Sequence, residues 1–149
     1  MTLSISVHDT LPEPETALIG EGLDAFNAAA APLHEVVPLA CFARLPSGAV
    51  VGGAVGRTWG ECCELQELWV DEAQRRQGIG ADLVRAFEAR ASARGCRTFY
   101  LHTFSFQAPK LYRSLGYEVA MALEGFAPGI VKYLMVRRVG GADPIQPVR

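Results

Sequence analysis

The segment from Arg75 to Gly80, Arg-Arg-Gln-Gly-Ile-Gly, has the residue types of an anion-binding turn. It stands between a predicted strand and a predicted helix, where free backbone N–H groups point outward and the helix dipole favours negative charge. Gly78 and Gly80 lack the Cβ atoms that would hold a bulky phosphate away, and the two arginines add positive charge. The sequence predicts phosphate or pyrophosphate binding here, with a tight turn and solvated arginines as the alternative.

Two common nucleotide motifs do not fit this turn. It lacks the Lys-Ser/Thr ending of a P-loop, and it lacks the complete Gly-x-Gly-x-x-Gly pattern with the later acidic ribose partner of a dinucleotide fold. The phosphate that it binds is therefore expected to belong to another kind of ligand.

Hydrophobic periodicity predicts the elements that position this turn. Alternating or continuous apolar runs predict strands, and apolar residues at spacings of three and four predict helices. Pro46-Ser47-Gly48 and Gly60 supply turns between three successive strands, which indicates an antiparallel meander. A strand, a helix from Gly78 and another strand form a βαβ unit with parallel strands, so the sheet is mixed. Strands are predicted at 3–7, 36–44, 50–58, 63–70, 98–103, 117–123 and 131–138, and helices between 14 and 32, at 78–95 and at 108–115.

Two segments resemble the GNAT superfamily of N-acetyltransferases. The first is Leu68-Trp69-Val70-Asp71-Glu72, followed by Arg75-x-x-Gly78-x-Gly80 and an amphipathic helix. The second, residues 108–117, is similar to the family's late helix and its Leu-Gly-aromatic strand entry. The resemblance covers residues 65–138 of the 149. One departure is Ser105, which stands where family members often carry asparagine.

The resemblance implies a single-domain, mixed α/β (α+β) fold with a central sheet of about six or seven strands and about three or four helices. It also implies that a splayed strand pair holds acetyl-CoA as the acyl-donor cosubstrate, with no metal. The pyrophosphate is expected on the backbone N–H groups of the turn, and the pantetheine arm beside the preceding strand. The cofactor-binding residues are then Leu68, Trp69, Val70, Arg75, Arg76, Gln77, Gly78, Ile79, Gly80, Ala81 and Ser105.

An amine that attacks a thioester needs a neutral lone pair, a donor to the developing oxyanion and a proton for the departing thiolate. The resemblance implies that the backbone N–H of Leu68 is the donor and that the Tyr112 hydroxyl gives the proton. The alternative for Tyr112 is a ring packed on the sheet with its hydroxyl as a polar handle.

Glu64 and Glu67 are the candidate general bases, because only about one lysine-like amine in a thousand is neutral at neutral pH. Their positions differ by an odd number, so their side chains are expected on opposite faces of the strand, Glu64 on the face of Leu68, and only one can serve. His102 is a third candidate, with core packing as the alternative.

Length and composition limit the other possibilities. The chain has room for one domain, predicted at residues 1–139, with a loose tail at 140–149. The net charge of −2 argues against nucleic acid, and no apolar run approaches the roughly 18 residues of a membrane span. The four cysteines and three histidines have no zinc-site spacing. Without a signal-like start, a cytoplasmic location is expected.

The sequence therefore predicts an N-acetyltransferase that acts on a primary amine of a small molecule, amino acid or peptide. A non-catalytic acyl-CoA-binding or regulatory module, or a transferase acting on a protein amine, is the alternative. The segment from Glu124 to Gly129 is either part of the acceptor pocket rim or a plain hairpin connection. An exposed edge strand near the carboxyl end would permit a homodimer.

Overall fold

The structure is a computed structural model that describes residues 2–140. Its contacts divide the chain into one compact unit that ends at Glu35 and another that begins at Val36, and each is described by itself. Among the described helices, none has the length and apolar character needed to cross a membrane. The tail predicted at 140–149 lies outside the described residues from residue 141 onward, and the domain boundary at 139 stays a prediction.

The first unit contains the helix α1 (Glu13–Ala30) and a short 3-10 helix, Leu33–Glu35. Pro12 is the N-cap of α1, and the chain turns extended at Ala31, before Pro32, so the predicted helix is confirmed. The strand predicted at residues 3–7 is wrong, since this segment has no strand structure and its apolar side chains are 85–90% exposed. Alternation marks two faces, but a strand also needs a partner for its backbone groups.

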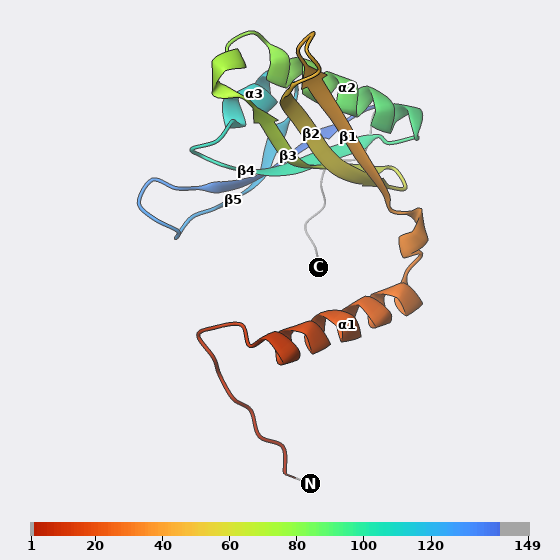
Figure 1. Ribbon diagram of the computed structural model, residues 1–149, viewed down its shortest axis with the longest axis vertical. Helices are drawn as coiled ribbons and strands as arrows, with labels where there is room; N and C mark the ends of the chain where they lie inside the picture. Colours follow the sequence, from red (N-terminus) through yellow and green to blue (C-terminus); the bar gives the residue numbers. More distant parts are fainter. Residues whose placement is uncertain (1, 141–149) are drawn as a thin grey trace. The chain divides into compact units, whose positions relative to one another are not determined.

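The second unit contains the elements β1 (Val37–Arg44), β2 (Val50–Trp59), β3 (Cys62–Val70), α2 (Ile79–Ala93), β4 (Thr98–Phe104), α3 (Pro109–Ser114), β5 (Glu118–Leu123) and β6 (Lys132–Arg138). Its strands form a six-stranded sheet in the order β1-β2-β3-β4-β6-β5 (Figure 1). All neighbours are antiparallel except β3 and β4, which are parallel and joined through α2, so the predicted meander, βαβ unit and mixed sheet are confirmed. The 3-10 helix η2 (Glu72–Gln74) precedes α2.

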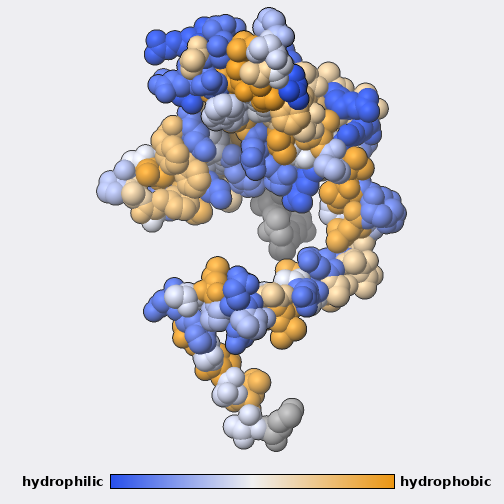
Figure 2. All heavy atoms as spheres, viewed as in Figure 1, coloured by the Kyte–Doolittle hydropathy of each residue, from blue (hydrophilic) through white to orange (hydrophobic). Residues whose placement is uncertain are grey.

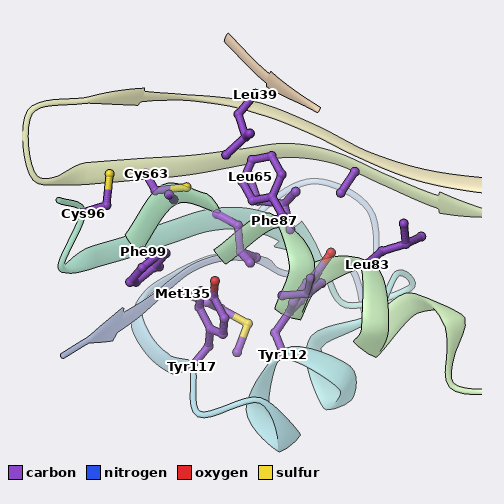
Figure 3. Packing of buried hydrophobic residues seen from close by; sticks show 14 residues of the cluster. Leu39, Cys63, Leu65, Leu83, Phe87, Cys96, Phe99, Tyr112, Tyr117 and Met135 are labelled. Atoms are coloured by element: carbon purple, nitrogen blue, oxygen red, sulfur yellow. The ribbon is translucent and has the colours of Figure 1, made fainter. Parts of the chain in front are cut away.

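The core lies between the sheet and the helices α2 and α3, which cover the same face (Figures 1 and 3). Phe87 of α2, Phe99 of β4 and Met135 of β6 are almost completely buried there. Glu88 of α2 accepts two hydrogen bonds from Arg137 of β6, whose guanidinium also lies 4.6 Å from the Phe99 ring centroid. Burial and this charge-assisted pair fix the helix α2, and therefore its amino-terminal end, on the sheet.

The strand β5 forms one edge of the sheet, and every residue of this strand is exposed. An unpaired edge of this kind is open to pairing with another strand. Strand-mediated dimerisation therefore stays a prediction.

An irregularity in β3 sets the direction of its side chains. The register between β2 and β3 shifts after Val55, because Val55 pairs with Glu67 whereas Gly56 pairs with Leu65. Gln66 is the extra residue, so β3 contains a β-bulge. On β3, the odd-numbered side chains consequently face the core before the bulge, and the even-numbered side chains face it after the bulge.

Gly56 is expected to be intolerant of any side chain at the bulge. A Cβ atom there would overlap the Glu64 carbonyl oxygen and lie 2.9 Å from Cζ of Phe87, so backbone and core would both have to move. Gly56→Ala should lower the free energy of unfolding by about 3 kcal/mol, measured by urea denaturation. Gly20→Ala is the control, because nothing lies within 4 Å of its new Cβ. Equal stability of the two variants would contradict this assignment.

Candidate functional site

The parallel strands β3 and β4 separate halfway along their length. They pair only from Cys62 to Leu65 on β3 and from Thr98 to Leu101 on β4. Beyond these residues β3 pairs only with β2, and β4 only with β6. The strand pair is therefore splayed, as the sequence resemblance implied.

A cavity of about 800 Å³ opens at the splay. Its walls include Leu68 and Val70, which pack against the core on the helix-covered face, and Glu67 and His102, which belong to the opposite face. The cavity is thus lined by residues from both faces of the sheet, which suits a reaction between two separately bound molecules. It is lined by Gln66, Glu67, Leu68, Trp69, Val70, Gln74, Arg75, Arg76, Gly78, Ile79, Gly80, Ala81, His102, Thr103, Phe106, Gln107, Ala108, Leu111 and Tyr112.

The glycine turn forms one end of this cavity. Gly78 is the N-cap of α2 and has a φ of 79°, a conformation that favours glycine. The first backbone N–H groups of the helix after it have no partner within the helix. At Gly80 the backbone is bare, and a Cβ there would have only Leu111 and Val70 side-chain atoms within 4 Å, the nearest at 3.5 Å. The turn therefore offers unobstructed backbone donors to an anion.

Arg75 has a second role in the same turn. Its Nε donates a hydrogen bond of 3.0 Å to the carbonyl oxygen of Val70, the last residue of β3. The arginine thus fixes the turn against the end of the strand while its charge remains beside the cavity. Arg76 has a φ of 65°, an uncommon backbone conformation for a residue other than glycine.

Tyr112 reaches the cavity from the helix α3 on the helix-covered face. It is only 7% exposed, and its ring packs edge-on against Tyr117 with 5.9 Å between centroids (Figure 3). Burial raises the pKa of Tyr112 to about 12, since the phenolate would lose its hydration. At neutral pH the side chain is therefore a neutral O–H donor facing the cavity.

The same burial predicts a loss of stability at high pH. The folded pKa of Tyr112, about 12, exceeds the ordinary value of 10.0, so the unfolded chain loses this proton first. The stability is fully present below about pH 10 and falls as the pH rises toward 12, by roughly 3 kcal/mol for this group. Urea unfolding at successive pH values should show a shallower decline for Tyr112→Phe than for the wild type. An identical decline would contradict the link to Tyr112.

The two glutamates differ from the sequence-based expectation. Glu64 lies opposite Arg57 and Glu67 opposite Val55, two positions apart on the regular strand β2, so both glutamates are on the same face. The prediction of opposite faces was wrong because the bulge at Gln66 reverses the alternation, and Leu68 therefore lies on the other face. Glu64 forms a 3.0 Å ion pair with Arg57 and does not line the cavity, whereas Glu67 does.

Ser105 is not part of the cavity wall. Its hydroxyl donates to the carbonyl oxygen of Gly129 at 3.1 Å and accepts from the N–H of Val131 at 3.0 Å. These bonds attach the β5–β6 loop to the end of β4, and the coenzyme contact of Ser105 stays a prediction. Of the other predicted coenzyme-contact residues, Gln77 does not line the cavity either, and the remaining ones all do.

Sequence reasoning missed several lining residues, including Gln66, Thr103, Phe106 and Leu111. Phe106 had a usable signal, since a phenylalanine in the short loop between a predicted strand and a predicted helix is a conspicuous loop residue. Gln66 had none, because only the pairing of β2 with β3 reveals the bulge.

The fold and this cavity define a class of protein, one in which a splayed pair of parallel strands opens a cavity beside a glycine-rich helix start. Comparison with known proteins agrees. Residues 8–117 match the acetyltransferase (GNAT) family. The chain is 35% identical to a blasticidin-S acetyltransferase of Streptomyces morookaense over 111 residues, 74% of this chain and 79% of that protein. It is 36% identical to an acetyltransferase of Agrobacterium fabrum over 74 residues, 50% of this chain and 54% of that protein.

The fold is also similar to that of a solved acetyltransferase structure. The crystal structure of an acetyltransferase from Bacillus cereus superimposes with a TM-score of 0.74 at 25% identity, covering 90% of this chain and 98% of the other. The chain therefore belongs to the acetyltransferase (GNAT) family and is an acyltransferase. Within residues 2–140, no group of three or more His, Cys, Asp or Glu side chains is arranged to hold a metal ion.

Proposed function

We propose that this acyltransferase transfers the acetyl group of acetyl-CoA to a primary amine of a small molecule, amino acid or peptide by direct attack. The observation that carries the proposal is the cavity, because one continuous space joins the glycine turn, Tyr112 and Glu67. A family relative that acts on blasticidin S supports a small-molecule acceptor.

The residues divide the binding between the two faces of the sheet. The backbone N–H groups around Gly78 to Ala81 bind the pyrophosphate, assisted by the charges of Arg75 and Arg76. The pantetheine arm lies between β3 and β4 along Leu68 to Val70, and directs the thioester toward Tyr112. The amine arrives from the face that carries Glu67 and His102.

Two protons must leave the nitrogen of an ammonium acceptor. Glu67 takes the first directly or through water, and the neutral amine then attacks the thioester carbonyl carbon, forming a C–N bond. The backbone N–H of Leu68 donates to the oxyanion. The C–S bond breaks, the thiolate takes the Tyr112 proton, and the second proton from nitrogen restores the tyrosine through solvent.

Thiol release from acetyl-CoA with a mixed panel of amines tests this proposal. Wild-type protein should release thiol only when an amine is present, with one N-acetylated product per thiol by mass spectrometry. A reaction without amine measures hydrolysis. Binding of acetyl-CoA without amine-dependent release across small, amino-acid and peptide amines would instead support a non-catalytic binding module.

A further inference from the structure

Three phenylalanines meet where β4 ends, beside the cavity. Phe104 and Phe106 are stacked, with 5.3 Å between ring centroids and 11° between planes. Phe126, from the loop between β5 and β6, meets Phe104 edge-on at 5.4 Å and 81°. Stacked and edge-on contacts at these distances are the favourable arrangements of aromatic rings. Together, Phe104, Phe106 and Phe126 form an aromatic shelf.

Hydrogen bonds hold the shelf in place on both sides. The Gln107 side chain accepts from the Phe104 N–H at 2.8 Å, and the Gln107 N–H donates to the Phe104 carbonyl oxygen at 2.9 Å, which closes the turn that carries Phe106. Ser105 binds Gly129 and Val131 and thereby fixes the loop that carries Phe126. The rings are therefore arranged before any ligand binds, which lowers the entropy lost on binding.

The shelf also offers free ring surface. Phe106 is 67% exposed and Phe126 is 50% exposed, whereas Phe104 is in contact with both rings and with the Lys132 ammonium, 5.6 Å from its centroid. Apolar residues gather on the β5–β6 loop (Figure 2). Residues 124–131 of this loop line a hollow of about 370 Å³. Single exposed apolar residues are ordinary, but an ordered group of rings at a ligand cavity indicates binding.

The position of the shelf distinguishes it from the rest of the cavity. Phe106 lines the cavity, as His102 and Thr103 do, and it follows the part of β4 that does not pair with β3. Phe104 pairs with Lys132 and lies on the same side of β4 as His102, the face from which the amine arrives in the proposed reaction. The shelf thus adjoins the acceptor side of the cavity.

We infer that the acceptor amine carries a planar aromatic or heteroaromatic ring, which stacks on the exposed face of Phe106, while Phe104 and Phe126 hold the Phe106 ring in place. This inference rests on the proposed amine acetylation. A flat ring gains from stacking in addition to burial of its surface, whereas a saturated ring of equal size gains only from burial. The shelf therefore selects flat rings over puckered rings.

The test compares 2-phenylethylamine with 2-cyclohexylethylamine, which place the amine at the same distance from a six-membered ring. With saturating acetyl-CoA, wild-type kcat/KM should favour the aromatic amine by about three- to tenfold. Phe126→Leu and Phe106→Leu should each reduce this ratio toward one. Phe42→Leu is the matched control, since Phe42 is a 55% exposed phenylalanine on β1 outside the cavity, and it should keep the wild-type ratio.

A ratio near one in the wild type, or a wild-type ratio in both shelf variants, would overturn the inference while leaving amine acetylation intact. Absence of thiol release with every amine would instead contradict the proposed function. In that case saturation-transfer NMR with 3-phenylpropanol and 3-cyclohexylpropanol still tests the shelf without catalysis. The aromatic alcohol should bind to wild-type protein and lose binding in Phe106→Leu; equal signals from the two alcohols would exclude the shelf as a ring site.

Discussion

Replacing Tyr112 by phenylalanine is expected to lower kcat by about 10²- to 10³-fold, while the affinity for acetyl-CoA changes little. The hydroxyl is the only group removed, and a positioned general acid contributes about 10²- to 10⁴-fold to a rate. The pKa of about 12 keeps this hydroxyl protonated throughout the neutral range, so a proton is always present for the departing thiolate. Steady-state kinetics and calorimetric titration with coenzyme A measure the two quantities separately.

Tyr117→Phe is the matched control for this experiment. Tyr117 is also buried, at 3% exposure, and its ring contacts that of Tyr112, but it does not line the cavity. Its hydroxyl interacts with Arg137, so its loss is expected to reduce stability by about 1 kcal/mol without a large change in kcat. Equal losses of kcat in both variants would mean that the tyrosines act through packing, and wild-type turnover in Tyr112→Phe would exclude the proposed proton transfer.

Most of the fold was predictable because each element of the second unit carries a strong local signal. The four-residue spacing of Ile79, Leu83 and Phe87 placed α2, and Gly78 placed its start. The failure at residues 3–7 shows the limit of such signals. Alternation describes the faces of a segment, whereas strand formation depends on a distant partner that one segment does not reveal.

The candidate site was predicted less completely, for a related reason. The glycine turn and Tyr112 are local features whose position follows from one turn and one short helix. The orientation of Glu67 depends on Gln66, the extra residue in β3, which is visible only in the pairing with β2. Ser105 likewise received its partners from a loop more than 20 residues away in the sequence, since Gly129 and Val131 are 24 and 26 positions later.

Glu67→Gln is expected to lower kcat/KM at neutral pH by about 10²-fold, because glutamine occupies the same space but cannot accept a proton from the amine. The defect should shrink as the pH rises toward the pKa of the acceptor amine, since free base then forms in solution without help from the protein. A pH series of kcat/KM for wild type and variant measures this convergence. A defect that is independent of pH would indicate that Glu67 binds the acceptor and does not deprotonate it.

Glu64→Gln separates the two glutamates on the shared face. Glu64 is engaged by Arg57 outside the cavity, and the arginine side chain is 53% exposed, so breaking this pair should change stability by no more than about 1 kcal/mol. We expect kcat/KM of Glu64→Gln to stay within about twofold of the wild type. Loss of a general base would lower kcat/KM far more, by about 10²-fold or greater. A loss as large as that of Glu67→Gln, with the same dependence on pH, would instead show that both carboxylates belong to one proton path across this face of β3.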